Sequence, residues 1–186
     1  MAILSLHPAP DEKEAKEFYF ALGCCVNAWA FVDRQLYSLA QFSLKMSDKQ
    51  TSFFFYQNRA FNQRLHFVDS ALRMAISKEQ FDTLWTPAHD RSKELSNTRN
   101  ILAHHPAKRT AMASRDDKPL YIYTIHIEPY ERILNREYKG LKGKTELDID
   151  DLKEHLAEVE SLVYSLGTLV ARLRIMSRLG RGKRSK

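Results

Sequence analysis

A long amphipathic stretch over residues 11–46 constrains the fold of this 186-residue sequence more than any other feature. Acidic residues predominate at 11–14, where they interact favourably with the positive end of a helix dipole. Apolar residues then recur three and four positions apart, a spacing that places side chains on one face of an α-helix. These residues are Leu22, Val26, Trp29, Leu36 and Ala40. The pattern predicts one long helix.

A second stretch with helical spacing covers residues 52–76. Its apolar stripe consists of Phe54, Phe61, Leu65, Val68, Leu72 and Ile76. Long helices joined by a few residues pack antiparallel, so this segment and the first predict an up-down bundle.

A third helix is expected to follow, and its limits are marked in the sequence. A capping-box pattern at 77–80 opens a short turn or helix. Thr86 and Pro87 then resemble an N-cap followed by proline at the first helical position. The helix should end at about His104, because Pro106 disfavours helical geometry at the residue before it.

The pattern changes between 107 and 147. Residues 120–128 are rich in β-branched and aromatic side chains and predict a strand, and 131–140 either pairs with it or forms a loop. Asp148 or Asp150 can then cap a last helix whose apolar residues extend from 152 to 170. The expected fold is therefore mainly α, a four- to five-helix up-down bundle with a small β-containing insertion between the third and last main helices.

The net charge of +6 is concentrated at the C-terminus, where residues 172–186 carry seven Lys and Arg and no acid. We expect a single domain over 1–178 and a basic flexible tail over 179–186. Basic ends of this kind bind nucleic acid or acidic membranes, unless they are simply solvated termini. The candidate RNA-binding residues are Arg174, Arg178, Arg181, Lys183 and Arg184.

The sequence also indicates a location. No apolar run reaches the roughly 18 residues of a membrane span, and residues 1–14 lack the features of a secretory signal. The two cysteines, Cys24 and Cys25, are adjacent and cannot link distant segments, and packing in the helix explains them better than reactivity. We expect a cytoplasmic protein without a membrane partner.

The segment SNTRNILAHHP, residues 96–106, places Arg99, Asn100 and His104 around a short apolar run. Asn100 and His104 are four residues apart and share a helix face. Arg99 and His104 are five apart, which is roughly 140° around the axis. They converge only if the helix end unwinds or a second subunit brings its own pair.

These residue types suit the cleavage of RNA. The negative end of the helix dipole favours a protonated histidine, which can transfer protons near neutral pH. Arginine offers a permanently charged fork that binds phosphate. When the ribose 2′-OH attacks the adjacent phosphorus, a base removes its proton, an acid protonates the leaving oxygen and a cation stabilises the phosphorane. No metal or other cofactor is required for this reaction.

The segment Arg99-Asn100-Ile101-Leu102-Ala103-His104 resembles the R-x4–6-H motif of the HEPN superfamily, and the GxxxNAWAxVDxxL run at 23–36 is similar to sequences of that superfamily. The resemblance covers about 11–105 and 148–178 and leaves the insertion unexplained. It implies a four- or five-helix fold and, in many members, metal-independent endoribonuclease activity in toxin–antitoxin and defence systems.

The resemblance also implies roles for residues and partners. Arg99 would stabilise the scissile phosphate, His104 would act as general acid or base, and Asn100 would orient the site. His105 and Asp33 are possible auxiliary residues. The implied partners are RNA, a second copy of the chain that brings two motifs into one cleft, and an antitoxin or other protein.

Alternative interpretations remain open. The chain could be a non-catalytic HEPN-fold module that binds a protein, nucleotide or RNA, or a dimerising bundle in which the histidines cap the helix end and Arg99 pairs with an acid such as Asp33. Zinc binding by His104, His105 and His89 is less favoured, because adjacent histidines lack the usual ligand spacing. A second match to R-x4–6-H, from Arg59 to His66, is expected to be solvated surface.

Overall fold

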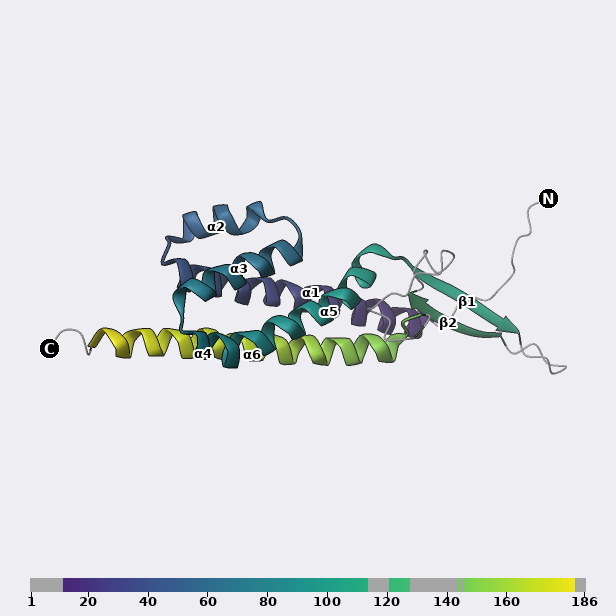
Figure 1. Ribbon diagram of the computed structural model, residues 1–186. Coiled ribbons are helices and arrows are strands. Elements are labelled where there is room, and N and C mark those ends of the chain that lie inside the picture. Colours follow the sequence, from purple (N-terminus) through teal and green to yellow (C-terminus); the bar gives the residue numbers. More distant parts are fainter. Residues whose placement is uncertain (1–11, 114–120, 128–143, 145, 183–186) are drawn as a thin grey trace.

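The computed structural model describes residues 12–113, 121–127, 144 and 146–182, with only the backbone described at 12, 108–113, 121–124 and 178–182 (Figure 1). This part of the chain is mainly helical, as expected. Its elements are α1 (Glu12–Leu44), α2 (Asp48–Gln57), α3 (Phe61–Ala75), α4 (Lys78–Gln80), the π-helical turn η1 (Phe81–Trp85), α5 (Thr86–His104), β1 (Ala107–Ala113), β2 (Tyr121–Ile127) and α6 (Ile149–Gly182).

The two longest helices, α1 and α6, pack side by side and run in the same direction (Figure 1). The Cys25 thiol donates a hydrogen bond to the backbone oxygen of Leu152 at 3.2 Å. One turn farther along, Trp29 Nε1 donates to Nε2 of the buried His155 at 3.3 Å. These contacts advance along both helices together, which fixes their parallel orientation.

The predicted helix over 52–76 is wrong in one respect, because the chain breaks at 58–60 and forms α2 and α3. Asn58 leaves helical geometry with ψ near 89°, and Ala60 is extended with ψ of 144°. Arg64 occupies the break: its Nη1 donates to the backbone oxygens of Asn58 and Arg59 at 3.2 and 2.9 Å. A side chain from α3 thus satisfies carbonyl groups that a continuous helix would have used.

The break changes the arrangement of the bundle. The successive helices α1, α2, α3, α5 and α6 alternate in direction, so the expected up-down order is present (Figure 1). The antiparallel neighbour that follows α1 is the short α2 at the edge, whereas α3, which forms most of the predicted second helix, runs parallel to α1 (Figure 1). Phe55 is the buried aromatic of α2, whereas Phe54, assigned to the stripe, is 45% exposed.

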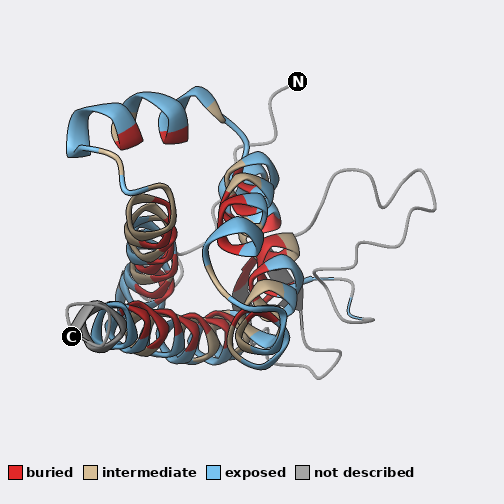
Figure 2. Ribbon diagram, turned by 60° about the vertical axis from the view of Figure 1, so that its left-hand side comes forward, coloured by how far each residue is buried: buried red, intermediate tan, exposed pale blue. Residues whose placement is uncertain are grey.

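Buried residues lie on the inward faces of the helices (Figure 2). Trp29, Leu36 and Ala40 belong to the main core, as predicted from their spacing. The assignment of Val26 to that stripe is wrong, since its side chain is 53% exposed. The residue one position earlier, Cys25, is buried instead.

A second core cluster lies at the other end of α1 and joins it to α5, β2 and the start of α6. Its buried members are Ala15, Phe18, Ala21, Cys25, Ile101, Leu102, Ile125, Ile127, Leu147 and Leu152. This cluster holds the end of α5 against α1.

The limits of α5 agree with the sequence at one end only. The capping box at 77–80 is present, but η1 continues directly into α5. The Thr86 hydroxyl donates to the backbone oxygen of Phe81 at 3.4 Å instead of capping, so the predicted N-cap is wrong. The helix ends at His104, and His105 is extended with φ −116° and ψ 136°, as Pro106 requires.

The strand expected over 120–128 is present as β2 and pairs antiparallel with β1, Ala107 opposite Ile127. The strand nature of β1 was not predicted, and the alternative partner at 131–140 lies outside the described residues. A bridge between Ile127 and Leu147 connects β2 to the chain before α6. Asp148 then caps α6, because its Oδ1 accepts from the backbone nitrogens of the next two acidic residues, 150 and 151, at 2.9 and 3.0 Å.

None of the described helices combines the length and apolar content that crossing a membrane requires.

We expect Asp69→Asn to reduce stability by about 1 kcal/mol at neutral pH, because the carboxylate of Asp69 accepts from Trp85 Nε1 at 2.9 Å and pairs with Arg73 at 3.0 Å. Burial opposes its ionisation, but these two hydrogen bonds lower the pKa of Asp69 below its ordinary value of 3.8.

A group with a lowered folded-state pKa contributes stability above its unfolded pKa and loses it as the pH falls through the folded pKa. The difference between wild type and Asp69→Asn should therefore shrink in acid below pH 3.8. Urea unfolding at several pH values measures it, and a pH-independent difference would contradict this role.

Candidate functional site

The end of α5 is fixed by two apolar side chains of the motif. Ile101 is 2% exposed and Leu102 is 6% exposed, and both belong to the second core cluster. Helical geometry then directs Asn100 and His104 away from that cluster, and both side chains are exposed. The polar residues of the motif thus lie on a rigid helix end and not on a loop.

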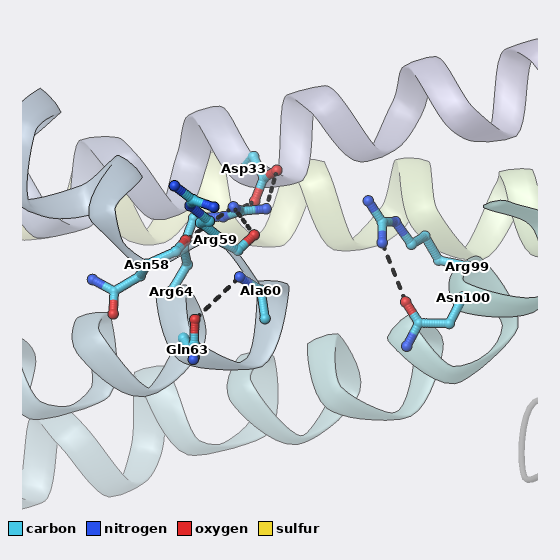
Figure 3. Close-up of polar contacts among 8 residues, drawn as sticks. All are labelled: Asp33, Asn58, Arg59, Ala60, Gln63, Arg64, Arg99 and Asn100. Atoms are coloured by element: carbon cyan, nitrogen blue, oxygen red, sulfur yellow. Dashed lines mark hydrogen bonds and ion pairs between the residues drawn. The ribbon is translucent and has the colours of Figure 1, made fainter. Parts of the chain in front are cut away.

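Arg99 and Asn100 interact directly. Arg99 is half-buried, and its Nη1 donates a hydrogen bond to Asn100 Oδ1 at 3.2 Å (Figure 3). The contact uses one N–H group of the guanidinium, which has other N–H groups that can donate to an anion.

The two histidines of the motif differ in exposure. His104 is exposed in the last turn of α5, where its ring is accessible from solvent. His105 is half-buried just beyond the helix, and its backbone nitrogen donates to the oxygen of Ile101 at 3.0 Å. The backbone of His105 therefore closes the helix, and His104 is the more exposed of the two rings.

Asp33 does not pair with Arg99, contrary to one sequence-based interpretation. Its carboxylate receives a bidentate pair of hydrogen bonds from Arg64, Nε to Oδ1 at 3.1 Å and Nη2 to Oδ2 at 2.9 Å (Figure 3). Their side chains are only 29% and 12% exposed. Arg64 is the same residue that binds the carbonyl groups at the break between α2 and α3. The Asp33–Arg64 pair therefore stabilises the contact between α1 and the start of α3.

The other sequence candidates are dispersed. His89 pairs with Asp90 at 2.9 Å near the start of α5, about 22 Å along the helix from His104, so these histidines cannot share a zinc ion. No cluster of three His, Cys, Asp or Glu with metal-binding geometry occurs among the described residues. Arg59 and His66 are both exposed, which confirms their assignment to solvated surface.

Arg174, the one candidate RNA-binding residue whose side chain is described, lies far from the motif within one chain. Arg174 is exposed near the end of α6, which is at the opposite end of the bundle from the end of α5 (Figure 1). It follows Leu152, a neighbour of the motif in the second core cluster, by 22 residues or about 33 Å of helix. The side chains of Arg178 and Arg181, and residues Lys183 and Arg184, lie outside the described part.

A groove of about 620 Å³ lies between α5 and α6, away from the motif. Arg91 crosses it and pairs with Glu94 and Glu158, both at 2.6 Å. The arginine is already neutralised by two carboxylates, so this groove offers no cation for a phosphate. The side chains of Tyr121 and Tyr123 on β2 lie outside the described part of the chain.

An exposed apolar face on α1 was not predicted from the sequence. Phe20 is 75% exposed, Tyr19 47%, Val26 53% and Phe31 46%. The apolar stripe predicted for α1 combined Val26, which belongs to this exposed face, with Trp29, which belongs to the buried face. The exposed face could have been recognised in the sequence only as a second apolar stripe on the same helix.

No protein-family model matches the chain, and no curated protein or solved structure matches it significantly.

We expect Cys25 to resist thiol reagents, because burial raises the pKa of its thiol to about 11. At pH 8 only about one Cys25 thiol in a thousand would be ionised. Timed titration of Cys24→Ser and Cys25→Ser with a disulfide reagent tests this: the variant that retains the half-buried Cys24 should react at least about 100-fold faster. Equal rates would contradict the packing role of Cys25.

Proposed function

We propose that this chain is a metal-independent endoribonuclease of HEPN type, and that Arg99 and His104 carry its activity. The observation that supports the proposal is the arrangement of the motif: an oriented arginine and an exposed histidine on one pinned helix end. The fold is a helical bundle, which agrees with the resemblance at the level of fold class only.

In the proposed reaction the guanidinium of Arg99 binds the scissile phosphate and stabilises the charge that develops on it. His104 transfers a proton to or from the reacting oxygens, and its exposure allows RNA to reach the ring. Asn100 holds the guanidinium through the 3.2 Å hydrogen bond. A second copy of the motif from a dimer partner would supply the other proton-transfer group.

The protein would then act in the cytoplasm with RNA as its substrate. A toxin or defence role with an antitoxin partner is implied by the resemblance alone. The alternative is a HEPN-fold module without catalysis that binds a protein, nucleotide or RNA. The proposed binding surface would then be the same helix end, with Arg99 as the anion-binding group and His104 without a chemical role.

Cleavage of labelled RNA by the purified protein in EDTA tests the proposal. We expect wild type to leave 2′,3′-cyclic phosphate ends, and Arg99→Ala and His104→Ala each to lose at least about 100-fold in rate. His66→Ala is a matched control, because it removes an exposed histidine from α3. Cleavage that survives both motif substitutions would contradict the assignment, and RNA binding without cleavage would support the alternative.

The proposed contact of the basic C-terminal residues with RNA predicts a change in salt dependence. Replacing Arg174, Arg178, Arg181, Lys183 and Arg184 by Gln should weaken binding. It should also reduce the slope of log affinity against log salt by about 0.7 for each phosphate that the protein no longer neutralises. Because Leu173 is 2% exposed and belongs to the core, substitution tests this better than truncation at 172. An unchanged slope would show that these five basic residues make no contact with the phosphates of RNA.

A further inference from the structure

The outer face of α1 is apolar along the middle of the helix. At 100° per residue, four exposed apolar side chains lie within about 80° of a line along the helix through Gly23. They are Tyr19, Phe20, Val26 and Phe31, which are between 46% and 75% exposed. Contiguous exposed apolar surface of this kind marks a site of association.

Gly23 lies at the centre of this outer face, and its own chain does not require a glycine there. A Cβ atom at this position would meet nothing within 4 Å. Glycine in the interior of a helix reduces its stability relative to alanine, so the fold of the single chain does not explain it. A missing side chain on an exposed apolar face permits close approach by another helix, because the distance between packed helices depends on the side chains at the contact.

Farther along α1, the same face is already covered by a helix. Tyr37 lies about 40° from the Gly23 line. Its hydroxyl donates to Asp48 Oδ1 at 2.7 Å, and its ring lies 5.5 Å from that of Phe55 and 6.0 Å from that of Tyr56. These three partners belong to α2, which runs antiparallel to α1 (Figure 1). Where the outer face is covered, it therefore binds a helix through aromatic side chains and a carboxylate.

The helix α2 covers only one part of this face. Arg64 binds the carbonyl groups at the break that follows α2 and also binds Asp33 on α1, so α2 ends beside Asp33. The apolar surface from Tyr19 to Phe31 begins there and extends about 18 Å along α1. It is a direct continuation of the contact between α1 and α2. A helix bound there would follow α2 end to end along α1.

The charges at the two ends of this surface indicate the kind of helix that fits. Lys16 and Arg34 are exposed within about 20° of the Gly23 line, about 27 Å apart, whereas the nearest carboxylate, Asp33, is bound by Arg64. Lys16 also has an interaction within the chain. A helix with acidic residues at both ends of its apolar stripe would place a carboxylate near each cation.

The same charges disfavour a second copy of this face as the occupant. Lys16 and Arg34 are equally far from position 25, the midpoint of the apolar surface. An antiparallel pair centred there would place Lys16 of each copy opposite Arg34 of the other, and a parallel pair would place each cation opposite itself. Like charges in contact across an interface are unfavourable.

We propose that the outer face of α1 between Lys16 and Arg34 binds an amphipathic helix of a different protein, with Asp or Glu at both ends of its apolar stripe. The bound helix packs on Tyr19, Phe20, Val26 and Phe31, and it approaches α1 most closely at Gly23. This proposal rests on the surface of α1 and not on the proposed ribonuclease activity.

Fluorescence anisotropy of a labelled peptide, titrated with the full chain, tests the proposal. The probe is a synthetic helical peptide of about 18 residues, long enough to reach both cations, with a leucine stripe and glutamates at both ends. A matched probe carries lysine in place of each glutamate. We expect the acidic peptide to bind at least about tenfold more tightly at low salt, and the difference to shrink as salt rises.

Two substitutions in α1 locate the binding site. Gly23→Gln should weaken binding of the acidic peptide about tenfold, because the new side chain prevents close approach while its own chain has room for it. Arg34→Glu should weaken binding of the acidic peptide and strengthen binding of the basic one, a reversal that misfolding cannot produce. Tyr164→Gln is the matched control, since Tyr164 is 78% exposed on α6, and circular dichroism checks that the helices are retained.

Equal affinity for the two peptides, no binding of either, or binding that is unchanged by both α1 substitutions would overturn the proposal. Sedimentation equilibrium without peptide tests the other occupant. A wild-type dimer that Gly23→Gln converts to a monomer would show that a second copy covers this face, which would also overturn the proposal. Selective binding of the acidic peptide by a protein that cuts no RNA would leave the docking site intact and remove the proposed activity.

Discussion

The parallel contact between α1 and α6 is the constraint on which the rest of the structure depends. Trp29 on α1 donates to His155 on α6, and Cys25 on α1 donates to the backbone of the same helix. Two parallel helices in direct contact cannot be joined by a short loop, so the intervening chain must return to the starting end of the bundle. The elements α2, α3 and α5 provide that return, and β1 and β2 lie at the end where α6 begins.

The candidate site follows from this arrangement. Because α5 returns antiparallel to α1, it ends beside the first half of α1, where Ile101 and Leu102 complete the second core cluster. The motif therefore contains two sets of residues. Ile101 and Leu102 are buried and fix the helix end, and the polar residues Arg99, Asn100 and His104 project from that end. The ion pair of Asp33 with Arg64 forms at a different corner and keeps Asp33 away from the motif.

The sequence predicted those features that depend on neighbouring residues. The three-and-four spacing of apolar residues located α1, the aspartates before α6 limited its cap to Asp148 or Asp150, and Pro106 located the end of α5. It failed where a distant side chain competes with local preference. The break at 58–60 is satisfied by Arg64, and the exposure of Val26 depends on which side of α1 the other helices occupy. Neither can be read from nearby positions.

For the site, the sequence alone determined which residue types stand together at one helix end, because their spacing is set by the geometry of a single helix. Only the tertiary structure decided their surroundings. Asp33 is engaged by Arg64, Arg174 lies about 33 Å along α6 from Leu152 beside the motif, and an aromatic face of α1 is exposed. The reason is physical: local geometry fixes the position of a side chain along its own helix, whereas its partners are set by packing between segments that are distant in the sequence.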